Sequence, residues 1–208
     1  RDLLPAWDLF IQSTATYAKS DGFRYDLVDV TRQVLANYGR PLQLKWAKAY
    51  QNKNVEAFRT YSREYIQLFD DMDRLLASRT DFLLGKWIAD ARSCGTTNAE
   101  KALYEKNARN LITLWGDADS PLHEYSNRQW SGLMTDFYKV RWEKYFAAME
   151  KSMTDGNEFD ATAFDKEIAQ WEWKWVNTQK NFPVDASGNS ISVAKELYKK
   201  YRKQINLL

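Results

Sequence analysis

Side chains that commonly carry metal or nucleophilic chemistry are scarce in this chain, which has one histidine, His123, and one cysteine, Cys94. A zinc site needs several histidine or cysteine ligands, and a di-iron bundle needs two Glu-x-x-His motifs. A catalytic nucleophile needs an adjacent base. Neither a Gly-x-Ser-x-Gly elbow nor a glycine-rich phosphate loop occurs. The sequence therefore predicts no metal site, no cofactor and no nucleophilic centre.

Carboxylates are plentiful in this chain, but none of them forms a recognisable catalytic pair. Asp70, Asp71 and Asp73 lack the glycine and the spacing of a calcium-binding loop, so we interpret them as a solvated helix face. Glycoside hydrolysis needs two carboxyl groups that flank a pocket about 5 to 10 Å apart. Four other acids have no spacing that sets them apart and are interpreted as ordinary helix-surface residues: Asp26, Asp29, Glu124 and Asp136.

Aromatic residues are unusually frequent, with 9 Trp, 12 Tyr and 10 Phe. Large rings usually fill the gaps between helices, although some form platforms for ligands such as sugars. Trp115 and Tyr125 bracket a short polar turn that begins at Gly116, so Trp115 is expected to pack against another helix, another domain or a ligand. Arg109 and Arg141 lie near tryptophans, and we interpret both mainly as structural cation–π partners.

Length and composition limit the classes to which the chain can belong. With 208 residues it can bury a sizeable core, because a chain of this size buries roughly 70% of its unfolded surface. The net charge of +2 is too balanced to predict nucleic-acid binding. No stretch is apolar for the roughly 18 residues that a membrane span requires. A single cysteine excludes an internal disulfide, which suits the cytoplasm as well as a bacterial secreted or periplasmic protein.

Apolar residues recur at helical spacing through nearly the whole chain, and no sustained alternation of period two occurs. The sequence therefore predicts an all-α fold, a single domain over residues 1–208 with about six or seven helices in an irregular bundle and no sheet. Start and stop signals place breaks at 21–22, 52–54, 78–81, 95, 116–121, 154–160 and 182–190.

Three local signals make sharper predictions about where helices begin and end. Pro41, together with Gly39, is expected to kink or interrupt a helix that starts near residue 23, because proline lacks an amide hydrogen and clashes with the preceding turn. Thr97 and Glu100 have the spacing of a capping box. Ser120 followed by proline predicts the start of a long helix that runs to about residue 152.

Several long segments, taken in order, resemble a known family. They are FRYDLVDVTRQVLANY, DFLLGKWIADAR, YEKNARNLITLWG and LHEYSNRQWSGLMTDFYKVRWEKYF. They are similar to the C-terminal α-helical domain of the α-N-acetylglucosaminidases, glycoside hydrolase family 89. The similarity covers residues 4–201 and is strongest over residues 104–145. This chain departs from the expected smooth helix near residue 40.

The resemblance implies a division of labour within a larger glycosidase. In this family a small domain and a catalytic barrel precede the helical domain, and the barrel carries two glutamates that cleave terminal α-linked N-acetylglucosamine with retention. No residue of this chain matches those glutamates, so the chain is expected to be inactive alone. It would pack on the barrel and help to wall the substrate pocket.

The resemblance also suggests residues for these roles. Trp115 and Tyr125 are the best candidates for the pocket wall, and Asn127 and Arg109 are weaker candidates for polar contacts or for bracing the aromatic pair. Residues expected to face the barrel are Arg24, Asp26 and Arg32.

Two further expectations concern location and an alternative function. A bacterial member would be secreted or periplasmic, whereas animal relatives are lysosomal. Since the chain begins without an initiator methionine, we interpret it as part of a longer protein. The alternative function is a stand-alone helical module that binds a carbohydrate or a protein helix through its aromatic surface.

Overall fold

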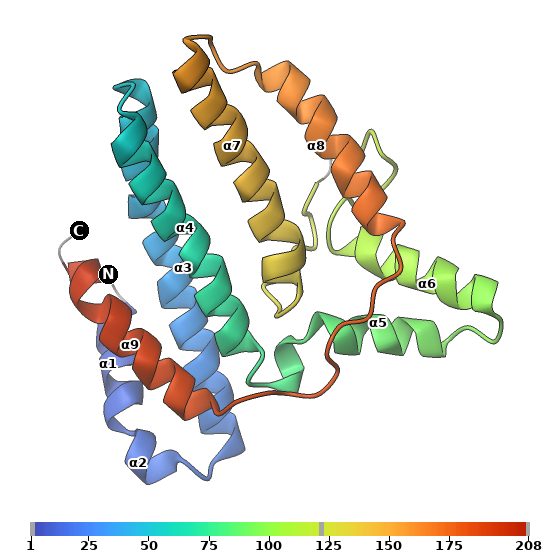
Figure 1. Cartoon of the computed structure of the whole chain (residues 1–208). Helices are drawn as coiled ribbons and strands as arrows, with labels where there is room; N and C mark the ends of the chain where they lie inside the picture. The colour runs from blue at the N-terminus through green and yellow to red at the C-terminus, as the bar shows by residue number, and fades with distance from the viewer. Residues whose placement is uncertain (1–2, 121–122, 207–208) are drawn as a thin grey trace. The chain divides into compact units, whose positions relative to one another are not determined.

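The computed structural model describes residues 3–120 and 123–206, and over these residues the fold is all-α with nine α-helices (Figure 1). The described residues contain no strand, only an isolated β-bridge between Leu83 and Ser131. The predicted fold class is therefore confirmed. The chain divides into two compact units, Arg1–Arg79 with Ala186–Leu208 and Thr80–Asp185. The single domain expected over residues 1–208 stays a prediction.

The first unit is built on two long helices that lie side by side, with the last helix against them (Figure 1). Its core is aliphatic and aromatic, and Leu35, Phe58 and Leu75 are fully buried in it. Burial of one apolar side chain of this size contributes about 1.5–3 kcal/mol. Its helices are α1 (Leu4–Gln12), α2 (Thr14–Tyr17), α3 (Asp21–Gln51), α4 (Val55–Leu76) and α9 (Ser190–Asn206).

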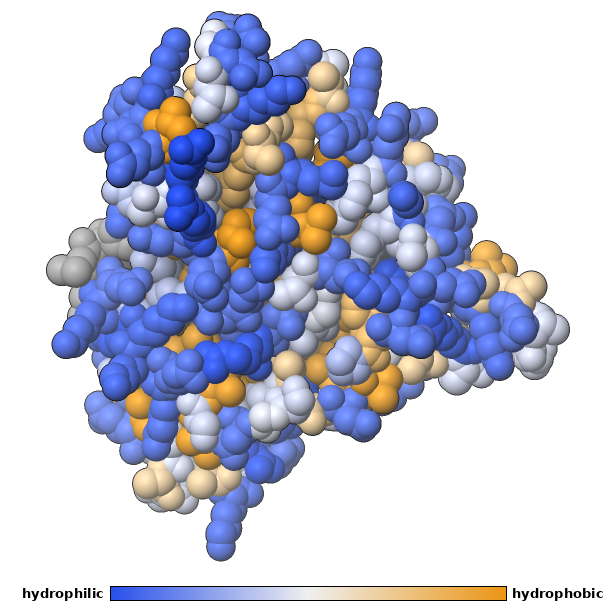
Figure 2. Space-filling model, in the orientation of Figure 1, coloured by the Kyte–Doolittle hydropathy of each residue, from blue (hydrophilic) through white to orange (hydrophobic). Residues whose placement is uncertain are grey.

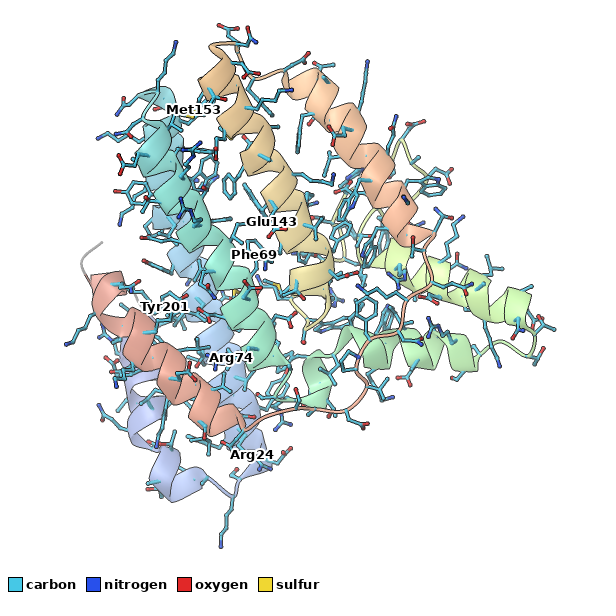
Figure 3. All side chains as sticks on the ribbon, viewed as in Figure 1. Arg24, Phe69, Arg74, Glu143, Met153 and Tyr201 are labelled. Atoms are coloured by element: carbon cyan, nitrogen blue, oxygen red, sulfur yellow. The ribbon has the colours of Figure 1, made fainter. Side chains whose placement is uncertain are left out.

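Charged hydrogen bonds join α4 to α9 within this unit. The buried carboxylate of Asp71 accepts hydrogen bonds from Tyr201 Oη and Lys200 Nζ, each at 2.5 Å. The interpretation of Asp71 as part of a solvated helix face is therefore wrong. Arg74 donates to both carboxylate oxygens of Glu196 at 2.7 and 2.8 Å; Figure 3 labels Arg74 on α4 and Tyr201 on α9. Burial, followed by the hydrogen bond to Asp71, raises the pKa of the Tyr201 hydroxyl above its usual value. These bonds fix α9 on α4.

Helix α3 begins at Asp21 and is continuous across Pro41, so the predicted break at 21–22 and the predicted interruption at Gly39 and Pro41 are wrong, whereas a kink at Pro41 stays a prediction. Proline removes one helical hydrogen bond and costs about 3 kcal/mol in a helix interior. Tyr38 and Leu42 on either side of it are buried, at 5% and 0% exposure. Because the flanking turns are packed into the core, tertiary contacts outweigh the local cost of the proline.

The second unit has three α-helices of 14 to 16 residues and a shorter one. Leu84, Ile88, Leu114 and Phe137 are nearly inaccessible and form part of its core. Its elements are the 3₁₀ turn η1 (Thr80–Phe82), α5 (Leu84–Ser93), α6 (Asn98–Leu111), the π-helical turn η2 (Met134–Lys139), α7 (Val140–Asp155) and α8 (Ala161–Val176).

Local start signals succeed at one helix of this unit and fail at another. The capping box of Thr97 and Glu100 is present with both of its hydrogen bonds, so that prediction is confirmed. By contrast, residues 123–130 are turns and irregular backbone, so the helix predicted to start at Ser120 is wrong over this stretch. Regular helical structure resumes at η2 and continues into α7. The proline that followed Ser120 in that signal, Pro121, lies outside the described residues.

Hydrophilic residues cover most of the face drawn in Figure 2, and hydrophobic residues show between them in several separate places. Large side chains more than half exposed include Leu9, Tyr17, Leu44, Leu103 and Tyr125. Isolated exposed apolar residues are normal, so exposure alone does not mark any of these side chains as part of a binding site.

Candidate functional site

The candidate site is the loop that joins α6 to η2. Asn110 ends α6 with two acceptors: its backbone carbonyl accepts from the amide of Trp115 at 2.8 Å, and its side-chain oxygen accepts from the amide of Gly116 at 3.2 Å. A Cβ on Gly116 would lie 2.8 Å from the side chain of Ser120, so this close turn favours glycine. These local hydrogen bonds and the glycine turn therefore fix the backbone conformation at Trp115.

Trp115 and Tyr125 contact each other across this loop. Their ring centres are 5.1 Å apart and the rings are tilted by 51°, a favourable geometry for an aromatic pair. Trp115 is half-buried, whereas Tyr125 is 72% exposed, the largest fraction among the exposed large hydrophobic residues. Asn127 is also exposed, two residues further on. Three of the four predicted substrate-binding residues thus lie on one accessible loop.

The backbone at both sides of this loop is strained. Trp115 has φ +57° and Glu124 has φ +61°, in the left-handed region that residues with a Cβ rarely adopt. Each such residue costs about 1–3 kcal/mol unless its surroundings hold it, and strained residues cluster at functional sites. The amide of Glu124 donates to the carbonyl of Thr113 at 2.6 Å, which ties the second half of the loop to the first.

An ion-pair network lies behind the loop and consists of His123, Glu124, Arg141 and Glu172. Arg141 on α7 pairs with Glu124 and donates to Glu172 Oε1 on α8 at 3.0 Å. The second carboxylate oxygen of Glu172 lies 3.3 Å from His123 Nδ1. The Glu172 side chain is only 2% exposed, so its charge depends on these partners.

The charge of Arg141 is stabilised by this network. Burial opposes the charged form, but the carboxylates of Glu124 and Glu172 outweigh it and raise the pKa of Arg141 above its ordinary value. The guanidinium also lies 5.3 Å from the ring centre of Phe137 and 5.5 Å from that of Tyr138. Arg141 therefore joins the loop, α7 and α8 at a single point.

A hollow of about 380 Å³ opens beside the network, between α7 and α8. Its walls are mostly apolar, and the charged groups that reach it include Glu172 and Arg141, which already neutralise each other. The lining residues from the two helices include Trp142, Tyr145, Phe164, Ile168 and Ala169.

Arg109 lies in the interior of the second unit, with 0% exposure. Its guanidinium donates twice to Glu105 Oε1, at 3.0 and 2.8 Å, and once to the carbonyl of Lys180 at 3.3 Å. Burial, the largest effect, lowers its pKa below the ordinary value, although the Glu105 carboxylate opposes that shift. The rings beside it are Trp175 and Phe182, so the described contacts give Arg109 a bracing role on these rings and not on the Trp115–Tyr125 pair.

The three residues predicted to face a barrel all lie on the first half of α3. Arg24 donates to Asp21 at 3.2 Å, and Arg32 donates to Asp29 at 2.9 and 2.8 Å, so both arginines form ion pairs within α3. Asp26 is exposed. These contacts leave their role toward another domain a prediction.

Sequence reasoning did not identify Glu124 or Glu172 as parts of a site. Glu124 was interpreted as a helix-surface acid, and Glu172 follows a tryptophan in an ordinary amphipathic pattern. Only Arg141, beside Trp142, carried a signal, and it pointed to cation–π packing. The link between Arg141 and Glu172 spans 31 residues, so no local pattern could have predicted it.

Within residues 3–120 and 123–206, no group of three or more His, Cys, Asp or Glu side chains is placed to bind a metal ion. None of the helices in the described part of the chain has both the length and the apolar character needed to cross a membrane.

The fold and the loop define a class of protein: an all-helical protein that carries an aromatic pair, with the Tyr125 ring exposed, on a braced and strained turn. Residues 1–200 match the family described as the alpha-N-acetylglucosaminidase (NAGLU) C-terminal domain. The chain belongs to this family, and the resemblance seen in the sequence is confirmed.

Individual relatives support the same assignment. The chain is 33% identical over 201 residues to the human protein alpha-N-acetylglucosaminidase, covering 96% of this chain and 27% of the relative. A family 89 glycoside hydrolase from Clostridium perfringens, solved with 2-acetamido-1,2-dideoxynojirmycin, has a TM-score of 0.84 and 35% identity, over 95% of this chain and 23% of that one.

A further C. perfringens structure, solved with its substrate GlcNAc-alpha-1,4-galactose, has a TM-score of 0.85 and 33% identity. It covers 99% of this chain and 24% of the solved chain. The chain thus spans about a quarter of the length of the relatives it matches.

Proposed function

We propose that this chain is the non-catalytic helical domain of a retaining α-N-acetylglucosaminidase. In this proposal it packs on a catalytic barrel of the same polypeptide and forms part of the wall of the pocket for terminal α-linked N-acetylglucosamine. The catalytic glutamates would lie in the barrel, outside this chain. Family membership supports the proposal, as do the similar C. perfringens proteins solved with 2-acetamido-1,2-dideoxynojirmycin or with GlcNAc-alpha-1,4-galactose.

The observation that carries the pocket-wall role is the Trp115–Tyr125 pair. An exposed phenol ring 5.1 Å from a half-buried indole offers an apolar face to a pyranose ring. The strained backbone at Trp115 and at Glu124, the residue before Tyr125, supports a functional reason for the arrangement, because strained residues cluster at functional sites. Asn127 on the same loop would supply a polar contact, and Arg109 would act indirectly by bracing Trp175 and Phe182.

Docking on the barrel has separate support. Tyr104 and Leu111 lie seven residues apart on one face of α6 and are 38% and 40% exposed. This stripe runs along the helix that leads to Trp115 and is the kind of exposed apolar surface that a partner domain covers. Arg24, Asp26 and Arg32 on α3 of the first unit would form a separate set of polar contacts to the barrel.

Activity measurements on the intact glycosidase test the pocket-wall role. Trp115→Ala and Tyr125→Ala are each expected to lower kcat/KM for an aryl α-N-acetylglucosaminide by at least about tenfold, equal to about 1.4 kcal/mol of transition-state binding. Trp115→Phe keeps a flat apolar ring and is expected to retain most of the activity. Tyr17→Ala, which removes an exposed tyrosine of the other unit, is the matched control and should change little.

Three results would contradict the proposal. Wild-type kcat/KM in both alanine variants would remove the pair from the pocket. Hydrolysis by the isolated chain would overturn the division of labour between this domain and the barrel. Tight binding of N-acetylglucosamine-terminated glycans by the isolated chain, followed by tryptophan fluorescence, would favour the stand-alone binding module instead, because part of a pocket should bind weakly.

A further inference from the structure

We propose that Arg141 is a positioning residue for the substrate pocket: by pairing with Glu124 it holds Tyr125 in contact with Trp115. This inference rests on the proposed function, since it names a residue that positions the aromatic pair of the same pocket wall. Arg141 itself lies behind the loop, on α7, and acts through Glu124.

The contact with Arg141 acts on the backbone conformation of Glu124. Its φ of +61° is unfavourable for a residue with a Cβ. Its amide donates to the carbonyl of Thr113 at 2.6 Å, which holds Glu124 against the first half of the loop. If Glu124 relaxed to a negative φ, the peptide that follows it would rotate. Since Tyr125 is the next residue, its ring would leave the position in which its centre is 5.1 Å from that of Trp115.

Arg141 is suited to prevent this relaxation because it bridges two carboxylates. One guanidinium nitrogen pairs with Glu124 and the other donates to Glu172 at 3.0 Å. Glu172 is 2% exposed and anchors the bridge in α8, and His123 contacts its other oxygen at 3.3 Å. A planar guanidinium can serve both partners at once, whereas the single ammonium group of lysine serves them poorly.

The second unit offers a matched ion pair that lacks the link to the loop. Arg92 pairs with Glu105 at 2.5 Å, with side-chain exposures of 28% and 2%. The corresponding exposures for Arg141 and Glu172 are 23% and 2%. Arg92 also donates to Asn181 and to the carbonyl of Lys180, away from the aromatic pair in sequence. Arg92→Met therefore removes a comparable ion pair without touching Glu124.

A double-mutant cycle on the intact glycosidase tests the inference. Arg141→Met and Tyr125→Ala are each expected to lower kcat/KM at least about tenfold, while the double variant should lose little more than Tyr125→Ala alone. Arg92→Met combined with Tyr125→Ala should instead give the product of the two single effects. Arg141→Lys should recover only part of the loss.

A second variant and a second measurement distinguish a loss of positioning from a folding defect. Glu124→Gln removes the same ion pair at a side chain that is 31% exposed, and it should reproduce the non-additive loss. Hydrogen exchange on this chain should show faster exchange of the Glu124 amide in Arg141→Met and Glu124→Gln, and wild-type exchange in Arg92→Met.

The outcomes separate this inference from the proposed function. If Tyr125→Ala and Trp115→Ala both keep wild-type kcat/KM, the pocket wall fails and the positioning role fails with it. If Tyr125→Ala loses activity but combines multiplicatively with Arg141→Met and with Glu124→Gln, the positioning role alone is overturned. Unchanged exchange of the Glu124 amide in both variants would also overturn it.

Discussion

The guanidinium of Arg109 lies 4.5 Å from the centre of the Trp175 ring, inside the second unit and away from solvent. Phe182 flanks the same group at 5.3 Å, and Glu105 neutralises it. A cation so placed is held by ring faces and by a carboxylate at once. This relationship connects α6 to α8 and to the segment that follows α8.

Removing the charge of Arg109 should therefore destabilise the fold. Arg109→Met is expected to lower the free energy of unfolding by about 2–3 kcal/mol, because Glu105 stays buried and keeps only Arg92 as a cation. Urea unfolding followed by circular dichroism measures the change. Lys101→Met, at an exposed position of the same helix, is the control and should stay within about 0.5 kcal/mol of wild type. A change that small in Arg109→Met would contradict the structural role.

Two helical glycines should respond in opposite directions to alanine. A Cβ on Gly85 would lie 2.0 Å from the carbonyl oxygen of Pro183, so Gly85→Ala is expected to cost about 2 kcal/mol or more through a backbone shift. A Cβ on Gly39 would meet nothing closer than a Tyr65 ring carbon at 3.6 Å. Gly39→Ala should therefore stabilise the chain by about 0.5–1 kcal/mol. Thermal unfolding of both variants checks the pair, and equal signs would refute the packing described here.

The ion pair of Asp8 and Arg202 should make stability depend on pH in acid. Arg202 donates to Asp8 at 2.6 and 2.7 Å and, as the main cause, holds the pKa of the Asp8 carboxyl below its ordinary value. The stabilisation is therefore present above about pH 4 and is lost as the pH falls through the lowered pKa. Asp8→Asn should cost about 1 kcal/mol at pH 7, a typical value for a partly exposed pair.

The measurement is the difference in unfolding free energy between wild type and Asp8→Asn across the acid range. That difference should be constant from pH 5 to 8 and should shrink below about pH 4. Glu158→Gln, at an exposed position in a loop, serves as the control for a change of one acid to its amide. A difference that grows in acid would have the wrong sign for a lowered carboxyl pKa and would exclude this ion pair as its source.

Predictions from the sequence succeeded where the deciding contacts are local. The capping box of Thr97 and Glu100 depends on groups three residues apart, and both of its hydrogen bonds form. Asn54 and Asp160 likewise cap α4 and α8 through the amide three residues on. Signals of this kind act within one helical turn, so the order of residues is sufficient to predict them.

Predictions failed where packing opposes a local preference. Proline at position 41 favours a helix break, yet α3 passes through it because the neighbouring turns are buried. Ser120 and the residue after it favour a helix start, but residues 123–130 form turns and irregular backbone. In both cases contacts between distant segments outweigh an energy of a few kcal/mol that the local sequence supplies.

The sequence by itself determined the all-α class, most helix boundaries, the family, and the presence of Trp115 and Tyr125 on either side of a turn. Only the tertiary structure decided that these rings meet, that Tyr125 is exposed while Arg109 is buried, and that Arg141 joins Glu124 to Glu172. The physical reason is the separation in sequence between the residues that interact. Helical periodicity and capping depend on neighbours within about four residues, whereas a buried charge network is specified by residues that become neighbours only after the helices have packed.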